Sequence, residues 1–326
     1  MTLASLLSRI STIVVLAAAL VASPVRGDEA GAPDGADRRV LNGHVFMPST
    51  DVPPPFVTTS FASAMVVGAG QTSASYQVGD QVFSGTLQYA GIGGVLAYEY
   101  GFLNHFQVRV KLSEIIYSGT SGKSAIVVGT TLQGGGSAGF TASLPLGDSA
   151  RVGFLFDAGY QPNLALTIGT AIKSVIDSCS QPSGCDVTTG QVFQIRHLAT
   201  YEPAASISWA PLRALGLTGN VGYLWASEGG TSGNNSGQEW VLGAAADYDF
   251  GAISSVPVGL QVQFKWSAPR GSFLQHVTDL GGGIFYTGRK NLALGVQVIN
   301  RQFAVTPDVN VSWNTYISEI GLRYYW

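Results

Sequence analysis

The chain has 326 residues, of which 46% are hydrophobic and only 11% are charged, and its formal net charge is −3. Beyond the N-terminus no run reaches the roughly 18 apolar residues of a spanning helix, which excludes a helical membrane protein. No basic cluster is present, so nothing indicates nucleic-acid binding. A positive mean hydropathy and 42 glycines instead predict an all-β chain whose strands face lipid on one side and water on the other.

Residues 1–27 have the pattern of a secretory signal peptide. Arg9 supplies the positive charge, an apolar run extends from Ile10 to Ala22, and Val25 and Gly27 are small enough for the −3 and −1 cleavage positions. A transmembrane anchor is the alternative, but a spanning helix needs about 20 apolar residues. We therefore expect export followed by cleavage.

Residues 28–55 are rich in Asp, Gly and Pro and end in the triplet Pro53-Pro54-Pro55. This composition predicts a flexible periplasmic tail. A segment folded into the barrel mouth is the alternative that the sequence leaves open. The remaining residues, 56–326, are predicted to form the barrel.

Short segments with period-two alternation follow one another along the rest of the chain, joined alternately by short and long connections. The clearest is Val256 to Trp266, in which Val258, Leu260 and Val262 alternate with glycine and glutamine. Counting such segments predicts an antiparallel up-and-down barrel of about twelve strands, with ten and fourteen as the neighbouring possibilities. The expected strands are Val57–Gly68, Gly91–Phe102, His105–Ile116, Gly139–Leu146, Arg151–Tyr160, one ending at Trp209, Leu215–Trp225, Glu239–Phe250, Val256–Trp266, His276–Tyr286, Leu292–Arg301 and Ser312–Trp326. The stretch Ser118 to Gly136 is less clear, and an outer loop and an extended upper half of the fourth strand are both open.

The stretch Pro162 to Ser178 is ambiguous. Leu164, Ile168, Ile172 and Ile176 recur at helical spacing, so we expect a short helix in a long outer loop, and a pair of extended strand ends is the alternative. Cys179 and Cys185 follow closely and predict a small disulfide in an oxidising compartment. A pair of metal ligands is the weaker alternative for these cysteines.

The C-terminal segment Tyr316 to Trp326 alternates apolar or aromatic residues with charged and small ones and ends on an aromatic residue. It resembles the last strand of bacterial outer-membrane β-barrels. The segment from Tyr100 to Val110, YGFLNHFQVRV, resembles repeats in transporter-like barrels linked to the degradation of aromatic compounds. These resemblances imply an outer-membrane location, a Gram-negative source and recognition of the C-terminal strand by the barrel-assembly machinery.

Strand parity assigns mixed charges and many glycines to the inward faces. Small inward residues favour an open bore, although strand curvature is an alternative reason for inward glycine. The charged residues predicted to line the solute path are Glu99, Arg109, Lys111, Lys265, Arg301, Glu319 and Arg323.

The four histidines lie apart from any string of catalytic residues, and no phosphate loop or zinc-ligand spacing is present. We therefore expect neither an enzyme nor a cofactor. The predicted function is passive or gated passage of a small organic solute by a monomeric channel in outer-membrane lipid. A structural or surface-recognition barrel with a plugged lumen is the alternative, and a lipid-modifying enzyme is the least favoured.

Overall fold

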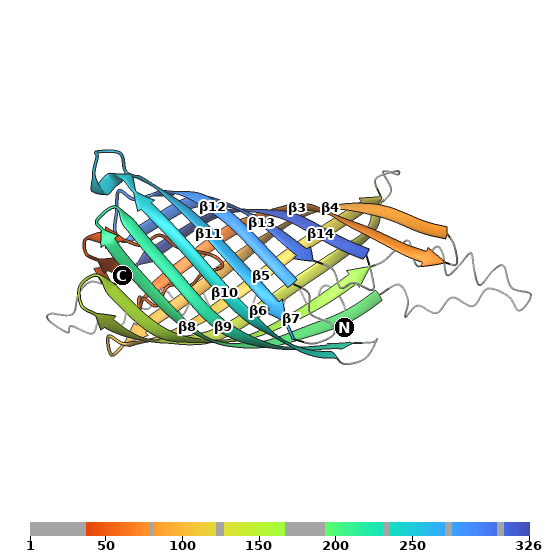
Figure 1. Cartoon of the computed structure of the whole chain (residues 1–326), viewed down its shortest axis with the longest axis horizontal. Helices are drawn as coiled ribbons and strands as arrows, with labels where there is room; N and C mark the ends of the chain where they lie inside the picture. The colour runs from red at the N-terminus through yellow and green to blue at the C-terminus, as the bar shows by residue number, and fades with distance from the viewer. Residues whose placement is uncertain are drawn as a thin grey trace, which may run out of the picture. The chain divides into compact units, whose positions relative to one another are not determined.

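Twelve antiparallel strands, β3 to β14, form a closed barrel in which β14 pairs with β3 (Figure 1). The computed structural model describes residues 37–78, 81–121, 127–166, 193–230, 235–270, 276–304 and 310–326. The barrel strands are β3 (Ser60–Val78), β4 (Gln81–Phe102), β5 (Phe106–Ser121), β6 (Val127–Leu146), β7 (Ala150–Leu166), β8 (Phe193–Leu212), β9 (Leu215–Gly230), β10 (Asn235–Asp249), β11 (Val258–Pro269), β12 (His276–Tyr286), β13 (Leu292–Ala304) and β14 (Asn310–Tyr325). The predicted all-β fold and the strand number are confirmed.

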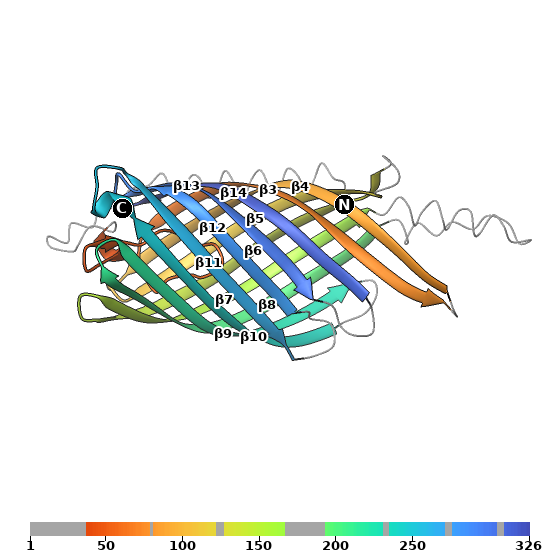
Figure 2. The same cartoon turned by 45° about the horizontal axis from the view of Figure 1, so that its top comes forward.

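The two faces of each strand have opposite chemistry, because successive side chains point to opposite sides of the sheet. On β11, Leu260, Val262 and Phe264 are exposed on the outside, whereas Gln261 and Gln263 are 2% exposed. The terminal strand follows the same rule and lies beside β3, which closes the wall (Figure 2). Large apolar side chains therefore form an outer band for lipid, and polar side chains point inward.

Short turns join the strands at one end of the barrel, as periplasmic turns do in this class of protein. The turn between β4 and β5 has positive φ at Leu103 (51°) and Asn104 (58°), and the turn after β6 has positive φ at Gly147. These turns set the strand register, in which Glu99 lies opposite Arg109.

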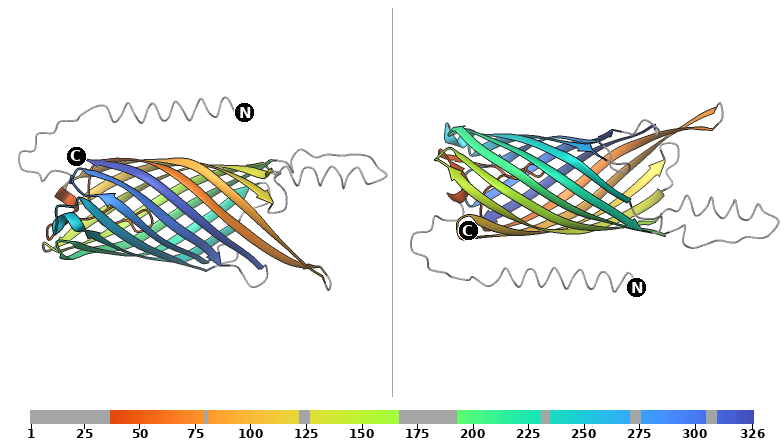
Figure 3. Two further views of the ribbon diagram at one scale, coloured as in Figure 1. Left: turned by 90° about the horizontal axis from the view of Figure 1, so that it is seen from above. Right: turned by 60° about the horizontal axis from the view of Figure 1, so that its bottom comes forward.

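At the opposite end of the barrel, the strands extend beyond the segments in which apolar and polar residues alternate. The β3–β4 hairpin extends beyond the neighbouring strands (Figure 3), because pairing continues to Val78 and Gln81. The unclear stretch from Ser118 to Gly136 is divided between β5 and β6.

The predicted helix does not form in its first part, since Pro162 to Leu166 continue β7 and pair with β8. At Leu164, the one member of the helically spaced set among the described residues, sheet pairing with Ile195 overrides that spacing. Residues 167–178 and the cysteine pair lie outside the described residues. Within the described ranges, no helix has the length and apolar character needed to span a bilayer.

Candidate functional site

An N-terminal segment, residues 37–59, lies inside the barrel at the end that carries the short turns (Figure 1), and we call it the plug. It consists of η1 (Asp37–Arg39), a small hairpin of β1 (Val40–Leu41) and β2 (His44–Val45), and an extended stretch that leads into β3. Several of its apolar side chains are at most 6% exposed, namely Leu41, Phe46, Met47, Val52, Phe56 and Val57. Burial of one such side chain is worth about 1.5–3 kcal/mol, so the segment gains by lying against the wall.

The position of residues 37–55 corrects the expectation of a free tail and agrees with the alternative of a segment folded into the barrel mouth. A free tail would leave its apolar side chains in water, whereas here these side chains are buried against the inner wall of the barrel. Residues 28–36 lie outside the described part of the chain.

The hairpin of the plug turns at Asn42 and Gly43, which both have positive φ (49° and 79°). Such two-residue turns favour Asn-Gly, because a residue with a Cβ atom is strained at the second position. The backbone N–H of Asn42 donates to the Asp148 carbonyl (2.8 Å), and its side-chain amide donates to the Ala210 carbonyl (3.2 Å). The hairpin is therefore fastened to two of the short turns.

The imidazole of His44 is fully buried and bound at both of its nitrogens. Nε2 makes a short hydrogen bond to Asp247 on β10, and Nδ1 lies 3.2 Å from the Arg213 carbonyl oxygen. Asp247 carries a carboxylate, so the contact at Nε2 joins the imidazole to an ionised group. This charge-assisted contact attaches the hairpin to the wall.

Arg39 attaches the start of the plug to the rim on the opposite side. Its guanidinium donates to the carbonyl oxygens of Phe46 (2.6 Å) and Lys290 (2.5 Å) and lies 4.3 Å above the ring of Tyr325. These contacts join the plug to the turn between β12 and β13 and to the last strand.

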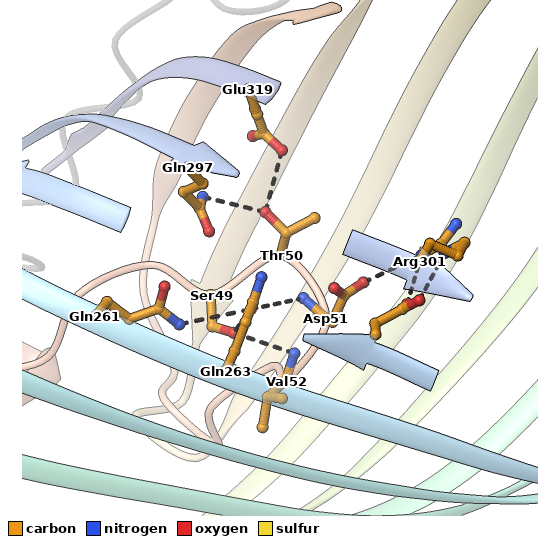
Figure 4. A network of polar contacts seen from close by, with 10 residues as sticks. Ser49, Thr50, Asp51, Val52, Gln261, Gln263, Gln297, Arg301 and Glu319 are labelled. Atoms are coloured by element: carbon orange, nitrogen blue, oxygen red, sulfur yellow. Dashed lines mark hydrogen bonds and ion pairs between the residues drawn. The ribbon is translucent and has the colours of Figure 1, made fainter. Parts of the chain in front are cut away.

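Deeper in the lumen, the backbone and side chains of Ser49 to Asp51 form a polar network with the wall (Figure 4). Ser49 Oγ donates to Gln263 Oε1 (2.5 Å), and the N–H of Asp51 donates to the same oxygen (3.3 Å). The Asp51 carboxylate lies 3.5 Å from Arg301, which also binds Asp279 at 2.7 Å. Burial raises the pKa of Asp51, and the nearby Arg301 guanidinium partly opposes this rise.

Thr50 extends the same network to two more strands (Figure 4). Its hydroxyl donates to Glu319 Oε2 on β14 (3.1 Å) and accepts from Gln297 Nε2 on β13 (3.1 Å). Together with the contact between Asp51 and Arg301, the network joins the plug to β11, β13 and β14.

Inward glycines make space for the plug. A Cβ atom added at Gly216 would lie 2.7 Å from His44 Cδ2 and 2.9 Å from Phe46 Cε1, and one added at Gly153 would lie 2.7 Å from Pro55 Cβ. Gly101, Gly243 and Gly259 face Val57, Val52 and Met47 in the same way. These glycines therefore accommodate the plug, a role distinct from the open bore and the strand curvature that the sequence indicated.

A cavity of about 300 Å³ remains between the plug and the opposite wall. Four of the residues predicted for the solute path line it: Glu99, Arg109, Lys111 and Arg323. The other three lie elsewhere in the lumen: Arg301 and Glu319 contact the plug, and Lys265 pairs in register with Asp279. Of the seven residues, four thus line the cavity, two contact the plug, and Lys265 lies on the wall apart from both.

Ion pairs brace the wall around the cavity. Arg323 NH1 lies 3.0 Å from Glu99 Oε1, and Glu99 also accepts from Ser60 Oγ (2.8 Å). Arg109 binds Asp157 with two parallel hydrogen bonds, although Glu99 is its register partner. Charges of opposite sign on several strands are therefore paired across the inner wall.

Sequence reasoning missed the anchors of the plug, which are Arg39, His44 and Ser49 to Asp51. One local signal for the hairpin was present, because Asn42-Gly43 lies between short apolar segments. The partners of these anchors lie more than 160 residues away, so no spacing in the sequence connects them.

Comparison with known proteins agrees with a membrane barrel. A family profile described as "Putative MetA-pathway of phenol degradation" matches residues 186–315, and no curated protein sequence matches the chain. The β domain of the Bordetella autotransporter Brka has a TM-score of 0.51 at 11% identity and covers 82% of this chain and 100% of that one. At this identity the likeness concerns the fold alone.

Two further solved structures have lower scores. The CymD monoaromatic hydrocarbon channel has a TM-score of 0.41 at 10% identity, over 82% of this chain and 88% of that one. A Pseudomonas aeruginosa FadL homologue has a TM-score of 0.42 at 10% identity, over 90% and 98%. Together, the closed twelve-stranded wall, its outer apolar band and the likeness in fold identify the chain as an outer-membrane-type β-barrel.

Proposed function

We propose that this barrel is an outer-membrane channel for a small organic solute, and that the plug gates it. The observation that carries the proposal is the cavity between the plug and the charged wall. Only non-covalent contacts are recorded between the described plug and the wall, so the plug can leave its seat without breaking a covalent bond. The profile match to a phenol-degradation family supports an organic solute.

A reversible cross-link between plug and wall tests this gating. An added Cβ atom at Gly243 would lie 3.1 Å from Val52 Cγ2, so a Val52→Cys/Gly243→Cys pair falls within reach of a disulfide. We expect the oxidised double variant to lose solute flux in liposomes and to regain it on reduction. Each single cysteine variant, oxidised in the same way, is the control for the two native cysteines.

The possible outcomes test the channel and its gating by the plug separately. Equal flux through the oxidised and reduced double variants would refute gating by the plug while leaving the channel intact. A folded wild-type barrel that gives neither conductance nor flux would refute the channel itself.

A structural or surface-recognition barrel is the second candidate, and two features favour it. The plug occupies much of the lumen, and the β3–β4 hairpin extends beyond its neighbours, where a partner could reach it (Figure 3). Absence of conductance from the refolded chain would support this role over transport.

We also propose that residues 1–27 direct export in a Gram-negative bacterium and are then removed. Recognition of Tyr316 to Trp326 by the barrel-assembly machinery would complete insertion of a monomer into the outer membrane. Fusion of residues 1–27 to a periplasmic reporter tests the export step, since a reporter that stays in the cytoplasm would contradict it.

A further inference from the structure

We propose that the cavity beside the plug binds a single-ring organic monoanion, with its carboxylate on the Lys111 ammonium and its ring on the plug. This inference rests on the proposed transport function and names its class of solute. Three features carry it: an exposed cation without an ion-pair partner, the small side chains around it, and an apolar surface facing it.

Among the described cations that line the cavity, Lys111 is the one that remains available. The guanidinium of Arg323 is paired with Glu99, and that of Arg109 is paired with Asp157. Arg39 is 5% exposed and is bonded to two carbonyl oxygens. Within the described ranges no ion pair or hydrogen bond is recorded for Lys111, which is exposed and lines the cavity.

The wall around Lys111 is built of small residues. Its register partners are Ala97 on β4 and Ser137 on β6, and the row continues to Gly159 on β7 and Thr200 on β8. No side chain in this row is long enough to fill the space beside the lysine. The ammonium therefore has room for a carboxylate at hydrogen-bonding distance.

The plug supplies the apolar side of the cavity. Phe46 and Phe56 line it, with ring centroids 4.9 Å apart, together with Pro53 and Pro54. A volume of about 300 Å³ equals that of roughly ten water molecules, which suits a molecule with one six-membered ring. Ring contact with the plug and ion pairing with the wall can thus occur together.

Glu202 sets the limit on ligand charge. It lines the same cavity and lies opposite Asp157 in the register. A second carboxylate on the ligand would meet this acid, because the described lining offers one available cation, and the Asp157 carboxylate is already paired with Arg109. The site therefore favours a monoanion over a dianion.

Calorimetric titration of the refolded full-length mature chain in detergent tests the inference. Benzoate is the probe, and benzyl alcohol and benzylamine are its neutral and cationic counterparts. We expect benzoate to bind at least tenfold more tightly than either counterpart, with an affinity that falls as salt rises. Lys111→Met should lower benzoate affinity at least tenfold and leave the affinity for benzyl alcohol unchanged.

Arg289→Met is the matched control, because it removes a positive charge from an exposed turn residue that does not line the cavity. It should leave benzoate binding unchanged, and heat-modifiable migration should show that both variants fold. Equal affinity for benzoate and benzyl alcohol, or tighter binding of benzylamine, would overturn the choice of an anion. Unchanged benzoate affinity in Lys111→Met would overturn the assigned residue.

Failure of this inference is distinguishable from failure of the transport proposal. If the barrel gives discrete conductance in planar bilayers while benzoate binding shows no preference over benzyl alcohol, transport stands and the anion site is wrong. If no solute crosses, transport itself is wrong, whatever the binding data show.

Discussion

Gly216→Val is expected to unseat the plug without disrupting the barrel. The added Cβ atom would lie 2.7 Å from His44 Cδ2 and 2.9 Å from Phe46 Cε1. The imidazole cannot rotate away, because Asp247 and the Arg213 carbonyl hold both of its nitrogens. The hairpin must therefore move as a unit, and the bond to Asp247 is lost.

The size of the effect follows from that bond. A hydrogen bond to a charged group contributes about 1.5–3 kcal/mol, and each 1.4 kcal/mol changes an equilibrium tenfold. The seated plug should thus become roughly ten- to a hundredfold less favoured relative to the released plug. We expect single-channel recordings in planar bilayers to show a corresponding rise in open probability.

Gly219→Val is the matched control on the same strand. An added Cβ atom at Gly219 would approach no closer than 3.8 Å to Ile207 Cγ2 and would face away from the plug. Open probability should then equal that of the wild type. Identical recordings from wild type and Gly216→Val, in a barrel that folds, would refute the account of how the plug is seated.

Three further predictions concern the lipid face, the inner wall and the plug. Leu260→Arg places a charge on the outer band, where Leu260 is 43% exposed, and should destabilise the inserted barrel by about 2–4 kcal/mol in urea titrations from liposomes; an unchanged midpoint would contradict the face assignment. Glu99→Gln leaves Arg323 without its carboxylate partner and should lower stability by about 1–3 kcal/mol, seen as a lower temperature of the heat-modifiable shift. The pKa of Asp51 is raised when the plug is seated, so its contribution to seating is complete below the ordinary value of about 3.9 and is lost as pH rises through the raised value. Open probability should therefore increase with pH over this window, and Asp51→Asn should flatten that increase; a steeper profile in the variant would refute the sign.

The alternation of apolar and polar residues along the chain was sufficient to predict the wall of the barrel. In β11, residues face lipid and lumen alternately along the strand. The outward position of Leu260 and the inward position of Gln261 can therefore be read from their immediate sequence neighbours. The same parity identified inward charges such as Arg109 and Lys111. Strand ends were less predictable, because pairing beyond the membrane depends on the neighbouring strand and not on lipid. For Pro162 to Leu166, pairing with β8 gave strand where the helical spacing predicted the start of a helix.

The plug could not be derived in this way. Its composition of Asp, Gly and Pro resembles that of a free tail, and only the Asn42-Gly43 turn indicated local structure. The surface that binds the plug forms only when the barrel closes, because Gly216, Asp247 and Gln263 come from different strands and line the same lumen. The amino-acid sequence by itself determined a barrel with an apolar outside and a charged inside, since that pattern depends on neighbours along the strand. Tertiary structure alone decided which charges pair, where the cavity lies and which lysine remains available, since those contacts form only when the sheet closes around the plug.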